Sequence, residues 1–100
     1  MIDKRPLEKN VEQSSRLLVK RYGGWMIKLT YIKGIPDRLV LAPGAVVFFV
    51  EFKRLGEKAG KLQGYRLKQM RKMGFTAEAI DNYEDFKKLF YSLQQKSKHL

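Results

Sequence analysis

Two acidic residues and one lysine have the types and the spacing of a hydrolytic metal site. Glu51 and Lys53 stand two positions apart at the end of the apolar run 46–50, and Asp37 precedes Glu51 by fourteen positions. Side chains two residues apart on a strand point to the same face of the sheet. Carboxylate oxygens suit Mg²⁺ or Mn²⁺, and such an ion with a neighbouring ammonium meets the needs of phosphodiester hydrolysis. The chemistry requires that the fold bring Asp37 to Glu51.

The elements that must position these residues form an α/β pattern. Hydrophobic periodicity and Gly or Pro breaks predict a helix over 7–22, strands over 25–32, 38–42 and 45–53, a helix over 61–73, a strand over 75–80 and a helix from 82 or 83 to about 95. We expect the tail over 96–100 to fray. The unbroken apolar run 46–50 implies a strand buried on both faces. A helix between two strands of one sheet implies a parallel crossover, which places the strand 75–80 beside the strand of Glu51.

Apolar stripes at helical spacing predict which helix faces are buried. On the first helix the stripe consists of Leu7, Val11, Ser14, Leu18 and Tyr22, and on the last helix it consists of Tyr83, Phe86, Phe90 and Leu93. Most aromatic residues are assigned to packing, namely Tyr22, Trp25, Phe48, Phe49, Phe86 and Phe90. Tyr65, which follows Gln63 on the second helix, faces either the core or DNA.

The turn between the second and third strands decides whether the two acids meet. Pro43-Gly44 is a turn signal, so the strands 38–42 and 45–53 are predicted to form an antiparallel hairpin. A two-residue loop pairs Asp37 with Val50 and turns Glu51 to the other face. A three-residue loop through Ala45 pairs Asp37 with Glu51. The sequence leaves both registers open.

Composition indicates one compact domain over 1–100 that binds a polyanion. The chain has 100 residues, 44% of them hydrophobic, and 21 Lys and Arg against 10 Asp and Glu give a formal net charge of +11. It has no Cys and a single histidine, His99, which excludes thiolate sites and histidine triads. No apolar stretch approaches the roughly 20 residues of a spanning helix. We expect a cytoplasmic protein that binds nucleic acid and no membrane.

The ordered motifs resemble those of a nuclease family. A helix with acidic residues is followed, in the order and on the elements expected, by Gly34-Ile35-Pro36-Asp37-Arg38, Val50-Glu51-Phe52-Lys53 and Gln63. From about Glu8 to Tyr83 the chain resembles the VRR-NUC family of the PD-(D/E)xK nuclease superfamily, as a stand-alone, phage-type member. The resemblance implies a restriction-endonuclease-like core, with a mixed sheet and the element order α-β-β-β-α-β-α. It also implies a DNA endonuclease that uses Mg²⁺ or Mn²⁺.

Carried over by position, the resemblance assigns roles to individual residues. Asp37 and Glu51 would be the metal ligands, with the backbone carbonyl of Phe52 as a further ligand. Lys53 would be the catalytic lysine. Gln63 would orient the site or contact the substrate backbone. The glutamate that the family has on its first helix is either Glu8 or Glu12, and the motifs do not choose between them.

Basic residues after the third strand predict a surface that follows phosphates. The candidates for DNA contact are Lys28, Arg38, Arg54, Lys58, Lys61, Arg66 and Lys68. Such contacts position a duplex without reading its bases, so binding should depend strongly on salt. The small size favours a homodimer, and two symmetric sites would suit branched DNA such as a four-way junction. A non-catalytic DNA-binding module and a ribonuclease remain as alternatives.

Overall fold

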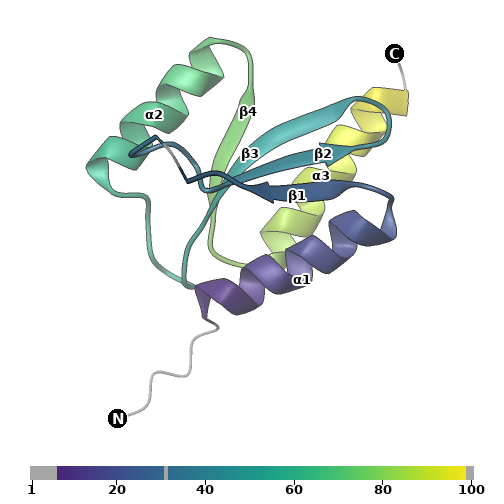
Figure 1. Cartoon of the computed structure of the whole chain (residues 1–100), viewed down its shortest axis with the longest axis horizontal. Coiled ribbons are helices and arrows are strands. Elements are labelled where there is room, and N and C mark those ends of the chain that lie inside the picture. The colour runs from purple at the N-terminus through teal and green to yellow at the C-terminus, as the bar shows by residue number, and fades with distance from the viewer. Residues whose placement is uncertain (1–6, 31, 99–100) are drawn as a thin grey trace.

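The computed structural model describes residues 7–30 and 32–98 as three helices around one four-stranded sheet (Figure 1). In chain order the elements are α1 (Glu8–Arg21), β1 (Trp25–Lys28), β2 (Arg38–Ala42), β3 (Val46–Phe52), α2 (Lys61–Lys72), β4 (Thr76–Ile80) and α3 (Tyr83–Lys98). This is the predicted order α-β-β-β-α-β-α. Among the described residues, no helix is long and apolar enough to cross a bilayer.

The sheet is mixed, with spatial order β1-β2-β3-β4. β2 pairs antiparallel with both β1 and β3, whereas β4 runs parallel to β3. The connection from β3 to β4 passes through α2, which lies beside β4 (Figure 1). α1 and α3 lie side by side on one face of the sheet. The predicted parallel crossover is confirmed, and it places β4 next to the strand of Glu51.

Alternate residues of β3 build the core against α1 and α3. Phe48, Val50 and Phe52 are buried, and the rings of Phe86 and Phe90 on α3 pack against Phe48. The opposite face of β3 is only partly covered, because Val47 is 43% exposed and Phe49 is half-buried. The prediction of a strand buried on both faces was therefore wrong. α2 reaches β4 and leaves the neighbouring part of that sheet face open.

The buried face of α1 shares only Val11 and Leu18 with the predicted stripe, and Leu7, Ser14 and Tyr22 are exposed. Val11, Ser15, Leu18 and Val19 are the buried residues of this helix, and Ser14 is exposed. At about 100° per residue, Ser15 lies directly above Val11, one turn away. Its hydroxyl donates a hydrogen bond to the Val11 carbonyl over 2.8 Å, which satisfies the buried polar group.

Two aromatic residues do not have the predicted core position. Trp25 is 69% exposed and Tyr22 is 44% exposed, although the Tyr22 ring contacts those of Phe90 and Tyr91. β1 is an edge strand, and its residue Met26 is the one that faces α1. Trp25 therefore points to the open sheet face, because successive side chains alternate. Tyr65 on α2 is 58% exposed.

Two element ends also differ from the prediction, while the other boundaries agree within about one residue. β1 ends at Lys28 rather than at position 32, because its partner β2 begins only after Pro36, which has no N–H to donate. The last hydrogen bond joins the Leu29 N–H to the Asp37 carbonyl. α3 continues to Lys98 instead of fraying from 96, and Ser97 donates a hydrogen bond to the Gly44 carbonyl. Residues 99 and 100, including His99, lie outside the described chain.

Candidate active site

The β2–β3 hairpin brings Asp37 opposite Glu51. Ala42 pairs with Val46 and Arg38 with Val50, so the loop contains three residues and the next pair along the ladder is Asp37 with Glu51. The loop is made possible by positive φ angles at Gly44 (85°) and Ala45 (61°). Of the two registers that the sequence left open, the fold adopts the one that places both acids on the same face of the sheet.

Burial makes both carboxyl groups harder to ionise. Glu51 is 5% exposed, and desolvation raises its pKa, with the negative charge of Asp37 adding to the effect. The pKa of Asp37 is also raised by burial, although the Arg38 guanidinium and then the Phe52 backbone N–H oppose the shift. Desolvated carboxyl groups that lie next to each other are expected where a cation binds between them.

Each of these carboxyl groups has a buried oxygen that finds no hydrogen-bond partner among the described residues. The atoms are Oδ1 of Asp37 and Oε1 of Glu51. Unpartnered buried oxygens are rare, because burying such a group costs roughly 1–3 kcal/mol. Among the residues that the structure describes, no three His, Cys, Asp or Glu side chains converge. The hard oxygens of these two side chains therefore fit a Mg²⁺ or Mn²⁺ ion that takes its other ligands from a backbone carbonyl and water.

Lys53 stands beside this pair on the same side of β3. Its ammonium nitrogen lies 3.7 Å from Oε2 of Glu51, and its side chain is 16% exposed. The Lys53 backbone N–H donates to the Ile80 carbonyl over 2.8 Å, which anchors the end of β3 to β4. The β-ladder rather than a flexible loop thus positions the lysine.

The comparison with known proteins finds a solved structure that is similar to this chain in fold and in sequence. No protein-family model matches the sequence, and the comparison with curated proteins finds no match. A solved structure described as a VRR_NUC domain has a TM-score of 0.77 and 29% sequence identity over 84% of this chain and 94% of its own. This chain is similar in fold and in sequence to a VRR-NUC domain. The predicted resemblance and fold class are confirmed, and the fold is of the PD-(D/E)xK nuclease type.

The two glutamates on the first helix have different surroundings. Glu12 accepts hydrogen bonds from Arg16 over 2.9 and 2.5 Å and from Nε of Arg38 over 3.3 Å. Glu8 is exposed at the start of α1, and its charge contributes to the raised pKa of Glu51. Glu12 is thus engaged by two arginines, whereas Glu8 remains electrostatically coupled to the candidate metal site.

Gln63 lies in the first turn of α2. Its amide oxygen accepts a hydrogen bond from the Gly60 N–H over 3.2 Å, which caps the start of the helix. The structure records no contact from Gln63 to Asp37 or Glu51 within the described residues. Leu62, the residue before Gln63, lies close to the backbone of Gly34 in the loop that precedes Asp37. A Cβ added at Gly34 would lie only 2.4 Å from the Cγ of Leu62.

The predicted DNA-contact residues differ in exposure and in their contacts. Lys28, Lys58, Lys61 and Lys68 are exposed, and Arg54 and Arg66 are half-buried. Arg66 donates a hydrogen bond to Gln69, and Arg38 contacts both Glu12 and Asp37. Sequence reasoning missed Arg16 and the bonded role of Arg38. The spacing of Glu12 and Arg16, one helical turn apart, was the available signal for the first contact.

Proposed function

We propose that this VRR-NUC domain is a metal-dependent DNA endonuclease. The observation that carries the proposal is the buried carboxylate of Glu51 next to the half-buried carboxylate of Asp37, beside the ammonium of Lys53. Each carboxylate has one buried oxygen that lacks a hydrogen-bond partner among the described residues. The raised pKa values of both acids are difficult to explain as a structural ion pair, which would lower them. A divalent cation bound by these oxygens would remove that conflict.

Asp37 and Glu51 would hold the Mg²⁺ or Mn²⁺ ion, with the Phe52 carbonyl as a further ligand. A bound ion supplies Lewis acidity toward a phosphate oxygen and lowers the pKa of a coordinated water. The donor set supports a hard cation because it contains oxygen alone and the chain has no Cys. Glu8 is the first-helix glutamate better placed to add an outer contact, since Glu12 is occupied by Arg16 and Arg38.

Lys53 would contact the reacting phosphate directly. Its ammonium can orient the attacking water and offset the negative charge that develops on the phosphorane. The water oxygen forms a bond to phosphorus while the bond from phosphorus to the 3′ oxygen breaks. The products are a 3′ hydroxyl and a 5′ phosphate. Partial burial of Lys53 keeps its charge close to the site and only weakly screened.

The exposed lysines after β3 and on α2 support the proposal that the substrate is DNA. Lys58, Lys61 and Lys68 lie on the segment that follows the Glu51 strand and along α2. They can contact phosphates on either side of the cut, with Gln63 near the start of the helix. The open sheet face carries exposed Trp25, Ile27 and Val47, an apolar surface that suits a second copy of the chain. A homodimer with two sites would cut branched DNA such as a four-way junction.

Cleavage of a panel of labelled DNA tests this function. Linear, nicked, flapped and four-way DNA and a matched RNA would be incubated with Mg²⁺, Mn²⁺ or EDTA. We expect metal-dependent cleavage of DNA, with the four-way substrate preferred, and a loss of at least about 10²-fold in Lys53→Ala. Lys87→Ala is the matched control, because Lys87 pairs with Glu84 on α3.

Each alternative gives a different outcome in this panel. Cleavage in EDTA or full activity of Lys53→Ala would contradict the mechanism. DNA binding that survives Asp37→Ala, with no cleavage by the unmodified chain, would identify a binding module. Faster cleavage of RNA than of every DNA substrate would identify a ribonuclease.

A further inference from the structure

Arg38 is the charged group in direct contact with Asp37. Its Nη1 atom lies 3.4 Å from Oδ2 of Asp37 and donates a hydrogen bond of 3.0 Å to the Asp37 backbone carbonyl. The Arg38 side chain is 15% exposed, so solvent screens this contact only partly. The two oxygens of Asp37 are therefore distinct: Oδ2 faces the guanidinium, and Oδ1 is the buried atom without a partner.

Glu12 fixes the other side of the same guanidinium. Its Oε1 accepts from Nε of Arg38 over 3.3 Å, and its side chain is 14% exposed. A guanidinium is planar, so holding Nε on Glu12 also sets the direction in which Nη1 points. Glu12 on α1 and Asp37 at the start of β2 thus bind one rigid cation from opposite sides.

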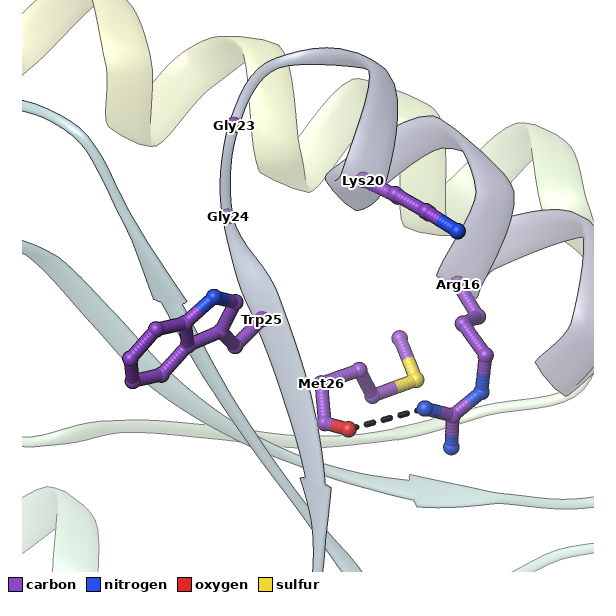
Figure 2. Close-up of a pocket in the computed structure, with 6 residues that line it drawn as sticks. All are labelled: Arg16, Lys20, Gly23, Gly24, Trp25 and Met26. Carbon is purple, nitrogen blue, oxygen red and sulfur yellow. Dashed lines mark hydrogen bonds between the residues drawn. The ribbon is translucent and has the colours of Figure 1, made fainter.

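Arg16 connects Glu12 to β1, the edge strand of the sheet. It donates to Glu12 and also, through Nη1, to the Met26 carbonyl over 2.9 Å. Figure 2 shows this hydrogen bond, with Arg16 reaching from α1 to the backbone of β1 while Trp25 projects from the strand in another direction. Glu12 is consequently held from α1 and from β1, and its position does not depend on its own flexible side chain alone.

We propose that Arg38, oriented by Glu12, is a positioning residue that holds Asp37 by Oδ2 so that Oδ1 faces the metal. The inference rests on the proposed metal-dependent function and adds a role for residues that sequence reasoning placed elsewhere. Glu12 acts through Arg38 and does not bind the metal itself. Arg38 serves the site from within the protein, and its contact with DNA phosphate is not required.

The sign of the effect on metal affinity separates positioning from simple electrostatics. A guanidinium next to the site repels a divalent cation, so its removal alone would strengthen Mn²⁺ binding. Loss of positioning has the opposite effect, because Asp37 would then adopt several orientations. Residues that orient metal ligands typically contribute about 10–100-fold to metal affinity.

Isothermal titration of the full chain with Mn²⁺, without DNA, tests the inference. We expect Arg38→Gln to weaken Mn²⁺ binding about 10–100-fold and Arg38→Lys to recover part of the loss, because Lys retains an N–H donor for Asp37. Glu12→Gln should weaken binding in the otherwise unmodified chain and have little further effect in the Arg38→Gln background. Arg71→Gln is the matched control, because Arg71 also bonds a carbonyl and a glutamate, on β4.

The outcomes distinguish this inference from the function on which it rests. Unchanged or tighter Mn²⁺ binding by Arg38→Gln would overturn the positioning role and leave the endonuclease intact. Additive losses for Glu12→Gln and Arg38→Gln would overturn the role of Glu12. Failure of the unmodified chain to bind Mn²⁺ would instead overturn the proposed function. If Arg38→Gln does not fold, Arg38→Lys decides, and an affinity equal to that of the unmodified chain counts against positioning.

Discussion

At the scale of single residues, the candidate site is organised at a cost to the stability of the fold. Asp37 and Glu51 are held in a partly dry environment next to each other, and burial raises the pKa of both. Each also has an oxygen that no group in the described part of the chain satisfies. Such groups persist in a folded chain when a ligand compensates them, and functional sites are where proteins keep them.

The first prediction concerns stability without metal. Because the folded-state pKa of each acid is raised, the unfolded chain loses its protons first as pH increases. Stability therefore falls as pH rises from the ordinary carboxyl pKa through the raised one. Asp37→Asn and Glu51→Gln should each stabilise the fold at pH 7 in EDTA by about 0.5–2 kcal/mol, with the gain lost below the ordinary carboxyl pKa. Thermal unfolding between pH 3 and pH 8 measures this.

Asp81 provides a control of opposite sign. The Gly56 N–H and Asn82 lower its pKa, so its contribution to stability is present at neutral pH and is lost as pH falls through the lowered value. Asp81→Asn should destabilise the fold at pH 7. Destabilisation by Asp37→Asn at pH 7 in EDTA would mean that the carboxylate is already well satisfied by the protein.

At the scale of elements, close backbone contacts determine how α1 meets the sheet. Gly24 joins α1 to β1, and its N–H donates to the Val19 carbonyl over 2.9 Å. A Cβ at this position would lie 2.5 Å from the Leu41 carbonyl oxygen and 2.9 Å from Cγ1 of Val19. The absence of a side chain is what lets the junction between α1 and β1 lie close to both Val19 of α1 and the backbone of β2.

The second prediction is that two glycine substitutions have opposite effects. Gly24→Ala should destabilise the fold by about 1–3 kcal/mol, because the backbone must move to admit the methyl group. Gly64→Ala on α2 should stabilise it by about 0.5–1 kcal/mol, because a Cβ there meets open space inside a helix. Urea unfolding measures both. Equal effects of the two changes would show that the α1–β1 junction is not tightly packed.

At the scale of the whole molecule, charge and apolar surface occupy different regions. The formal net charge is +11, and much of it lies on and before α2. The sheet face opposite α1 and α3 instead exposes Trp25, Ile27 and Val47. A patch of large apolar side chains on an otherwise strongly charged protein indicates a contact surface. The self-repulsion of two basic chains is smallest if they meet through this face.

The third prediction is that the apolar face mediates dimerisation. Sedimentation equilibrium should give twice the chain mass of 11.7 kDa for the unmodified protein and a single chain mass for Trp25→Lys or Val47→Lys. Leu17→Lys on the exposed side of α1 is the control, because Leu17 is 56% exposed and lies on a helix that covers the other sheet face. A monomeric unmodified chain would rule out the homodimer.

Much of the fold was predictable because periodicity is local. The order of helices and strands, the parallel crossover and the core residues Phe48, Phe86 and Phe90 follow from spacing along the chain. Errors occurred where a distant segment decides the outcome. Trp25 alternates with other apolar residues in the sequence, as a core residue would, but it lies on an edge strand. β1 ends early because its partner strand, β2, begins only after Pro36.

The sequence by itself determined the candidate chemistry: two carboxylates, a lysine two residues after one of them, and the strands that carry them. Only the tertiary structure decided that Asp37 and Glu51 meet, because the three-residue loop depends on the positive φ angle of Ala45, which its residue type does not predict. It also gave Glu8 and Glu12 different surroundings. That difference depends on whether Arg38, 26 positions from Glu12, reaches it in space. The spacing of residues along a helix predicts the face on which each side chain lies. Contacts between side chains of different elements form only when those elements pack together.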